Sequence, residues 1–376
     1  MKKLILPGAA ILTVALILSV YLFTTGRTRT QVFNSEPGIY CRNSGAKGFY
    51  SDKESILFDF IQKNFMGLRG EFITNTKHEE GKYTLSESVG LLMNYAVLTD
   101  RKDLFDLELS YLEKDLLSIG GNIKWRSGSD VTCNASVDDL RIIGALLDAY
   151  QKWGSESFLN TALCIQKTIL ETQVKDGCLN EVYDWKYNTT RYITPLCYLD
   201  LYQMKRLKYL DKRWEEVLEK STDIIANGRI NASPFYYKYY DYKDRKYLPD
   251  EEYEKTEGIC LTYTVITSIN LQLSGIYTGD FLSWLKGEME KGKLYAWYNP
   301  YNLKPVSGME STAVYALASI YARACGEDEL SAKLIERMLA YMVNDNSEFH
   351  GGFGNKDTCD FYSFDNLTAL IALAQK

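Results

Sequence analysis

The segment WRSGSDVTCNASVDDLRIIGALLDAYQKW, residues 125–153, decides the fold of this chain of 376 residues. It opens with a tryptophan and an arginine in a loop rich in Gly and Ser, and two adjacent carboxylates, Asp138 and Asp139, follow. Apolar residues then recur every three or four positions, at Leu140, Ile143, Leu146, Leu147 and Tyr150. This period predicts a helix with one broad buried face. The two aspartates fall in its first turn, where the helix dipole favours anions.

A pair of aspartates at this position has two interpretations. In the simpler one, both carboxylates only stabilise the start of the helix, and Asn134 or Ser136 caps it. In the other, the loop and the carboxylates belong to a functional cleft. The spacing of the residues around the pair weakens the first interpretation.

The same kind of helix recurs along the chain from about Ser51. A charged amphipathic helix is followed by a loop rich in Gly or aromatic residues, and then by a more apolar helix. The charged helices are expected at about 52–66, 101–118, 155–173, 211–227, 278–291 and 327–343. The apolar helices are expected at about 86–99, 137–153, 194–209, 257–275, 309–325 and 361–375. Six pairs with a repeat-like period predict an all-α fold, a double ring with amphipathic helices outside and apolar helices inside. Few segments alternate with a period of two, so no large sheet is expected.

The composition excludes several classes of function. The net charge of −6 argues against a nucleic-acid surface, so no nucleic-acid partner is expected. The two histidines, His78 and His350, lie far apart, and the eight cysteines form no CxxC pair. No metal site, no cofactor and no Ser-His-Asp triad is therefore expected. The 29 tyrosines and six tryptophans supply flat apolar surfaces of the kind on which sugar rings stack, although most belong to the core.

The N-terminal segment has the pattern of a membrane anchor. Residues 1–3 include two lysines, and residues 4–26 carry no charge, which is long enough to cross a bilayer. Neither a lipoprotein cysteine nor a clean A-x-A cleavage site follows, so an uncleaved anchor is favoured over a cleaved signal peptide, which would leave the protein secreted. The lysines are expected to hold the N-terminus inside. We therefore expect a cytoplasmic start at 1–3, a transmembrane anchor at 4–26, a linker at 27–50 and one extracytoplasmic helical domain at 51–376.

The segment from Ala135 to Trp153 resembles the signature of glycoside hydrolase family 8. That signature has Ala and Ser or Thr before two aspartates that are separated by one small residue, and small, aliphatic and aromatic residues follow. Asp139 matches the second aspartate, whereas Val137 stands in place of the first, substrate-contacting one. Asp138 either takes over that role or the role is lost. The family contains cellulases, chitosanases, xylanases and enzymes tied to exopolysaccharide secretion. The resemblance implies an (α/α)6 barrel and a hydrolysis reaction that inverts the configuration at the anomeric carbon.

Glu87 is the candidate general acid. Inverting hydrolysis needs a protonated carboxyl beside the leaving oxygen and a second carboxylate, about 6.5–9.5 Å away, that activates water. The run YTLSESVGLLM, residues 83–93, resembles the family segment S-E-G-x-G-Y-G-M, whose glutamate is the general acid and aligns with Glu87. Apolar neighbours raise the pKa of a carboxyl, as an acid at neutral pH requires. Taken alone, a Ser-Glu pair at a helix start is more often a cap.

The general base has two candidates. In many members of the family it is the aspartate of a Y-D-A-x-R run at the fourth inner helix, and that run is not intact here. Glu257 stands at the expected start of this helix as a longer substitute. Asp241 lies in the similar run YDYKDR, residues 240–245, which precedes the helix. The third alternative is a different residue or no base.

Other residues near the expected starts of inner helices are assigned to substrate binding. If the ring closes, the loops before these helices meet at one mouth, where aromatic residues and carboxylates gather. Asp138 and Asp139 belong to this group. Trp125 and Arg126 resemble the family's tryptophan loop, and Trp125 is expected to stack on a sugar. The remaining candidates are Tyr192, Trp297, Tyr362 and Asp365.

The resemblance and the anchor together predict a membrane-anchored, outward-facing glycosidase. Its substrate would be a polysaccharide, most plausibly an exopolysaccharide or another β-linked glycan, and Glu87 would act as the acid. The machinery that synthesises or exports such a polymer is a candidate partner. The alternative is a non-catalytic polysaccharide-binding or secretion-assembly protein on a degenerate hydrolase scaffold, which Val137 and the missing Y-D-A-x-R run favour.

Overall fold

The computed structural model describes residues 35–42, 50–77, 82–250 and 257–375, and this part of the chain is mostly helical. Two sets of helices alternate along it. The first set is α2 (Ser51–Asn64), α4 (Lys102–Tyr111) with the π-helical turn η3 (Leu112–Leu116), α6 (Glu156–Thr172), α8 (Trp214–Ala226), α11 (Gly279–Glu290) and α13 (Asp328–Leu339). The second set is α3 (Ser86–Leu98), α5 (Ser136–Trp153), η4 (Leu196–Tyr198) followed by α7 (Leu201–Leu207), α10 (Leu261–Leu273), α12 (Thr312–Ala324) and α14 (Ser363–Ala374). These bounds agree with the predicted pairs, except that the third apolar helix is shorter and the fourth begins later.

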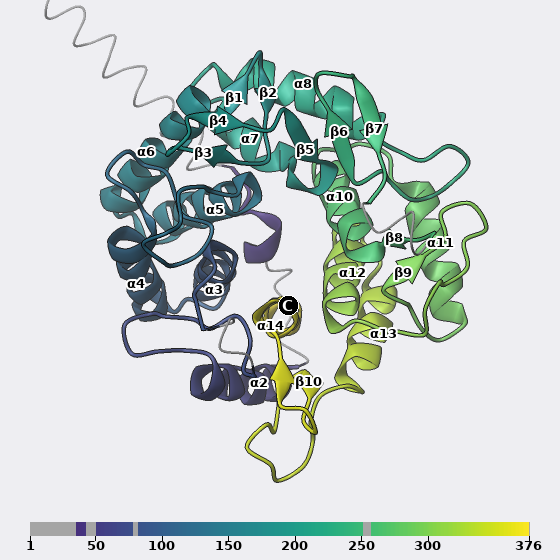
Figure 1. The fold of residues 1–376 in the computed structure, drawn as a ribbon. Helices are drawn as coiled ribbons and strands as arrows, with labels where there is room; N and C mark the ends of the chain where they lie inside the picture. The colour runs from purple at the N-terminus through teal and green to yellow at the C-terminus, as the bar shows by residue number, and fades with distance from the viewer. Residues whose placement is uncertain (1–34, 43–49, 78–81, 251–256, 376) are drawn as a thin grey trace, which may run out of the picture.

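The second set forms a closed inner ring. Each helix contacts its neighbours in the order α3, α5, α7, α10, α12, α14 and back to α3. From the first set, α2 packs on α14, α4 on α3, α6 on α5, α8 on α7 and α13 on α12, so these helices lie outside the ring (Figure 1). The arrangement is consistent with an (α/α)6 barrel, as the sequence predicts. Since α10 stands three places from α3 in either direction, these two helices face each other across the barrel.

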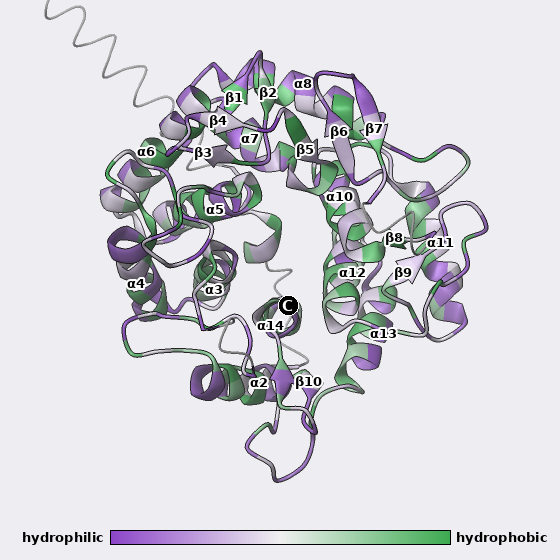
Figure 2. Ribbon diagram, viewed as in Figure 1, coloured by the Kyte–Doolittle hydropathy of each residue, from purple (hydrophilic) through white to green (hydrophobic). Residues whose placement is uncertain are grey.

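The difference between the rings follows from their sequences. α3 is buried at every residue from Ser88 to Leu98, because it packs between α4, its two inner neighbours and the barrel interior. The outer helices bury one stripe and expose the other, and Figure 2 shows hydrophilic residues on the outside of α4 and α11. Gly90 permits the closest approach between α3 and α5, because a Cβ there would lie 3.2 Å from atoms of both Arg141 and Ile142.

Short antiparallel strands join the loops at one end of the barrel. None of the strands in the described residues is longer than three residues, so the expectation of no large sheet is confirmed for this part of the chain. The pairs are β1 (Val174–Lys175) with β2 (Cys178–Leu179), β3 (Tyr183–Asp184) with β4 (Thr189–Thr190), β8 (Ile259–Cys260) with β9 (Trp297–Tyr298), and β10 (Gly354–Asn355) with β11 (Asp360–Phe361). A three-stranded sheet has the order β5 (Ile193–Pro195), β6 (Tyr239–Asp241), β7 (Lys246–Leu248).

These connections bring the starts of the inner helices together. Single bridges join Leu85 to Arg126 and Asn75 to Tyr362, and so link the loops that lead into α3, α5 and α14. The pairing of β8 with β9 does the same for the loops before α10 and α12. All of these helices therefore begin at one end of the barrel, which we call the mouth, and run toward the other, which we call the far end.

Part of the expected linker belongs to the barrel instead. The short helix η1 (Ile39–Cys41) lies inside the ring and joins the hydrophobic core (Figure 1). The prediction of a linker at 27–50 is thus wrong for residues 35–42, because Ile39 and Cys41 are apolar enough to be buried. The expected anchor at 4–26 lies outside the described residues. In the part that is described, the helices fall short of the length and apolar content that a membrane crossing requires.

One buried carboxyl on the outer ring lacks the partners that its burial calls for. Glu108 of α4 is fully buried, and neither of its carboxyl oxygens has a hydrogen-bond partner within the described structure. Burial raises the pKa of Glu108 well above its usual value, and the nearby Glu71 adds to the rise. A glutamate in an unfolded chain titrates near ~4.3. The folded state therefore keeps this proton longer than the unfolded state, and stability falls as pH rises above that value.

We predict that Glu108→Gln stabilises the protein in a pH-dependent way. The amide keeps the shape of the protonated acid and never ionises, so the gain over wild type should grow by up to about 1.4 kcal/mol per pH unit above ~4.3, until Glu108 ionises in the folded state. Chemical denaturation at pH 4.5 and pH 8 measures this. An equal stability difference at both pH values would contradict the assignment of Glu108 as a buried neutral acid.

Candidate active site

A pocket opens at the mouth between the starts of α3 and α5. Its volume is about 390 Å³, and it is lined by Leu85, Glu87, Trp125, Cys133, Asn134, Ala135, Asp138, Val182 and Tyr198. Three of the residues predicted for the site, Glu87, Asp138 and Trp125, therefore meet in one cavity. Glu87 reaches it from the first turn of α3, and Asp138 from the first turn of α5.

Asp138 is held on both sides by hydrogen bonds. Its Oδ1 accepts from the guanidinium of Arg141 at 2.5 Å, and its Oδ2 accepts from the Ser86 hydroxyl at 2.9 Å. All three side chains are buried. Burial alone raises the pKa of Asp138, while Arg141 and Ser86 oppose the rise. Because two donors serve this carboxylate, Asp138 is the ionised member of the pair that it forms with Glu87.

Glu87 is the protonated member of this pair near neutral pH. Burial first and the Asp138 carboxylate second raise the pKa of Glu87 to about 7, against the opposing effect of the Arg141 guanidinium. Asp365 adds a smaller contribution in the same direction as Asp138. A carboxyl with this pKa can donate a proton at neutral pH and accept it back afterwards.

Asp139 has a different environment from its neighbour. Its Oδ2 accepts from the Asn134 amide at 2.6 Å, and the same amide donates to Gln173 at 2.8 Å. Burial raises the pKa of Asp139 well above its usual value, and the residue does not line the pocket. It connects the start of α5 to the loops behind it. The expected cap is wrong, because the residue before the helix is Ala135 and neither Asn134 nor Ser136 makes a capping bond.

Asp365 does not line the pocket and lies on α14, which contacts α3 as α5 does. It lies in the first turn of α14, and its Oδ1 accepts from the backbone N–H of Ala313 at 2.9 Å. Burial raises the pKa of Asp365. Tyr362, just before this helix, is 46% exposed.

Among the aromatic and basic candidates, only Trp125 lines this pocket. Arg126 bonds Asp130 at 2.7 Å, and its guanidinium carbon lies 5.3 Å from the ring centres of both Trp125 and Tyr83. It thereby supports the tryptophan from outside. Tyr192 carries the Lys243 ammonium 4.6 Å from its ring centre. Trp297 lies in β9, paired with the residue before α10.

Neither sequence candidate for the base lines the pocket with Glu87. The carboxylate of Asp241 accepts from the backbone N–H groups of Lys243 and Asp244, and so closes the turn between β6 and β7. Those N–H groups outweigh desolvation and lower the pKa of Asp241. Glu257 is exposed and precedes β8, because α10 begins only at Leu261. The helix begins late since Ile259 and Cys260 pair with β9.

A different carboxylate lies beside the start of α10. Asp250 is 5% exposed, and its Oδ2 is 3.4 Å from the ammonium of Lys238. Burial raises the pKa of Tyr263, in the first turn of α10, to about 12, and the charge of Asp250 adds to that rise. Sequence reasoning missed Asp250 because it opens an acidic run, DEEYEKTE, that reads as a solvated loop. Its only signal is its place after Pro249, at the end of the β7 segment.

Tyr198 connects the two sides of the mouth. It lines the pocket, and burial raises the pKa of its hydroxyl, with smaller contributions from Cys197, Asp138, Glu181 and Tyr263. Its hydroxyl is therefore within electrostatic reach of both Asp138 and Tyr263. No group of three or more His, Cys, Asp or Glu side chains that could hold a metal ion occurs among the described residues.

Comparison with known proteins gives a consistent result. The family model described as "Glycosyl hydrolases family 8" matches residues 41–236. The protein named "Putative lipoprotein YdaJ" of Bacillus subtilis (strain 168) is 27% identical over 322 residues, which cover 83% of this chain and 84% of that protein. Among solved structures, "a novel alpha-amylase from Clostridium perfringens" has a TM-score of 0.81 and 34% identity over 88% of this chain and 99% of its own. PssZ from Listeria monocytogenes has a TM-score of 0.70 and 25% identity, over 85% and 94% of the two chains.

We predict that Asp138→Asn lowers the pKa of Glu87 from about 7 toward the ordinary glutamate value. The substitution removes the negative neighbour and leaves Arg141 unneutralised, and both changes favour ionised Glu87. The pKa of Glu87 is measured by carboxyl carbon NMR on protein labelled in glutamate. The signal of Glu87 is assigned by its loss in Glu87→Gln. The matched control is Asp103→Asn, at an exposed aspartate in the first turn of α4, outside the pocket. An unchanged or higher Glu87 pKa in Asp138→Asn would contradict this account of the pair.

Proposed function

This chain belongs to family 8 of the glycosyl hydrolases, and from this premise we propose that it cleaves a polysaccharide outside the cytoplasm by an inverting mechanism with Glu87 as the general acid. The observation that carries the proposal is the pair formed by Glu87 and Asp138 in a pocket beside Trp125. A protonated carboxyl, an ionised carboxylate and an aromatic wall are the groups that glycosidic cleavage uses.

The proposed first event is proton transfer from Glu87 to the glycosidic oxygen. The pKa of Glu87, raised to about 7, keeps the proton available at neutral pH. Asp138 stays ionised through Arg141 and Ser86, and its charge favours the positive charge that develops on the sugar ring. Trp125 offers a face for an adjacent sugar. When the bond breaks, Glu87 holds the negative charge that its proton leaves behind.

We assign the general base to Asp250 rather than to Asp241 or Glu257. Inversion requires the base on the opposite face of the sugar from the acid, and Asp250 lies by the start of α10, across the barrel from α3. The ammonium of Lys238 lies 3.4 Å from its carboxylate. Asp241 is instead occupied by the turn that it closes.

The proposed substrate class is a glucan or a related exopolysaccharide. The Clostridium perfringens structure, at 34% identity, is named as an alpha-amylase, so α-linked glucans join the β-linked glycans that the sequence suggests. Residues 4–26 and the lipoprotein named among the relatives support an enzyme held at the outer face of the membrane. The machinery that makes or exports the polymer remains a candidate partner on the same grounds.

We predict that Glu87→Gln abolishes glycan hydrolysis while the fold is kept. Losing the general acid should lower the rate by roughly two to four orders of magnitude. The assay measures new reducing ends from a panel of α- and β-linked glucans, xylan, chitosan and exopolysaccharide, with the exposed Glu329→Gln of α13 as the control. If wild type binds a glycan of the panel but cleaves none, the protein is a binding module on this scaffold. If Glu87→Gln keeps full activity, Glu87 is not the general acid.

We predict that Asp250→Asn also abolishes turnover, whereas Asp241→Asn leaves it within about twofold of wild type. The first substitution removes the group that would activate water, and a base contributes roughly 10²–10⁴-fold. The second changes only an exposed turn. The measurement is the steady-state rate of each variant on the substrate that the glycan panel identifies. Inactivity of Glu257→Gln or Asp241→Asn combined with activity of Asp250→Asn would reverse the assignment.

A further inference from the structure

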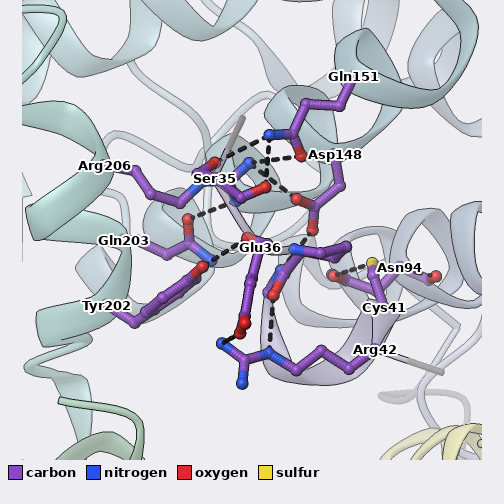
Figure 3. Close-up of polar contacts among 12 residues, drawn as sticks. Ser35, Glu36, Cys41, Arg42, Asn94, Asp148, Gln151, Tyr202, Gln203 and Arg206 are labelled. Carbon is purple, nitrogen blue, oxygen red and sulfur yellow. Dashed lines mark hydrogen bonds and ion pairs between the residues drawn. The ribbon is translucent and has the colours of Figure 1, made fainter. Parts of the chain in front are cut away.

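Residues Ser35–Arg42 close the far end of the barrel, and we call them the plug. Figure 3 shows how they are held. The backbone N–H of Gly38 donates to Asp148 at 2.9 Å, and the side chain of Gln151 donates to the carbonyl and the hydroxyl of Ser35 at 2.9 and 2.8 Å. The Cys41 thiol donates to the Asn94 side chain at 3.2 Å.

The receiving groups are themselves fixed. Asp148 forms an ion pair with Arg206 at 2.8 Å, and both side chains are at most 2% exposed. Arg206 also donates to Gln203 at 3.1 Å. The last helix joins them, since Gln375 donates to the carbonyl of Ile39 at 2.6 Å. These contacts come from the later parts of α3, α5 and α7 and from the residue after α14, so the plug occupies the end of the barrel opposite the mouth.

Tyr40 extends from the plug toward the candidate active site. It shares a small cavity of about 30 Å³ with Arg141, Asp200 and Val137, which lies next to Asp138 on α5. Burial raises the pKa of Tyr40, and Arg141, Asp200 and Glu87 all act on its hydroxyl. Tyr40 therefore borders the same arginine that binds Asp138 in the pocket.

Arg141 is packed closely on one side and borders a small cavity that Tyr40 also lines. Its side-chain carbons would lie 3.2–3.3 Å from a Cβ on Gly90 of α3, so one side is packed. Its guanidinium is bound to Asp138 and is buried. The 30 Å³ cavity, about the volume of one water molecule, is the open side, and Tyr40 limits it.

We propose that the plug is part of the catalytic apparatus, with Tyr40 as a positioning residue that holds Arg141 against Asp138 and Glu87. The inference rests on the proposed function for its meaning in catalysis. It makes the segment that joins the barrel to residues 1–34 a component of the site rather than a tether. The charged and titratable groups that face Glu87 are Asp138 and Arg141 from α5, Asp365 from α14, Tyr198 from η4 and Tyr40 from the plug.

The direct test is Tyr40→Phe in the full-length chain. Without the hydroxyl, Arg141 gains room to withdraw from Glu87 and the floor becomes less polar, and both changes favour protonated Glu87. The Glu87 pKa, followed by carboxyl carbon NMR, should rise by roughly half a unit, and the basic limb of kcat/KM should move upward by the same amount. The control Tyr209→Phe alters a partly exposed tyrosine at the same end and should shift neither.

A second variant distinguishes the effect of displacing the whole plug from the effect of removing the Tyr40 hydroxyl. A Cβ at Gly38 would lie 2.9 Å from the Gln203 amide and 3.2 Å from Asp148, so Gly38→Val should unseat the plug. The buried Cys41 thiol then becomes reactive, as peptide mass spectrometry after alkylation shows, with the exposed Cys164 and Cys359 as internal standards. In Tyr40→Phe, Cys41 should stay protected.

The proposal is overturned if Glu87 titrates as in wild type in Tyr40→Phe, or in Gly38→Val once Cys41 is labelled. The NMR titration needs no substrate, so it stands apart from the test of hydrolysis. If wild type cleaves no glycan and Tyr40→Phe still shifts the Glu87 pKa, the proposed function fails while the positioning role stands.

Discussion

The ion pair between Arg141 and Asp138 is the interaction on which the candidate site depends. It brings one buried positive charge near three carboxyls, those of Asp138, Glu87 and Asp365. Breaking such a buried pair costs roughly 3–5 kcal/mol, because the remaining charge stays buried without a partner. One cation cannot neutralise all the carboxyls, and it binds Asp138 directly. The proton therefore remains on Glu87, so the packing of the helices sets the acid–base state of the pocket.

The barrel explains how groups distant in sequence come to share this space. Each inner helix begins at the mouth, and a carboxylate in its first turn gains from the helix dipole. Glu87, Asp138 and Asp365 follow this rule on three neighbouring helices. The far end uses its own buried pair, Asp148 with Arg206, to hold the plug. Each end is thus organised around a buried pair of an arginine and an aspartate.

The sequence predicts the rings well because their signal is local. Burial on one face or on all faces produces a period that is visible within each helix, and the six pairs follow from it. Glu87 and Asp138 can also be predicted as site residues from the sequence, since both lie at helix starts beside recognisable motifs. The position of Asp250 cannot be predicted in this way, because its environment comes from Lys238 and from Tyr263, which lie on other parts of the chain. The plug was missed for the same reason: its eight residues carry no periodicity, and only the closed ring offers the polar groups that bind them.

The most direct measurement is a structure of the catalytically impaired Glu87→Gln protein with an oligosaccharide of its substrate bound. The account predicts a sugar chain across the pocket, stacked on Trp125, with a glycosidic oxygen within hydrogen-bond reach of residue 87. It also predicts Asp250 on the opposite face of the same sugar, within about 6.5–9.5 Å of residue 87 and holding a water molecule at the anomeric carbon. An oligosaccharide bound away from residue 87, or a sugar with no carboxylate on its opposite face, would contradict it.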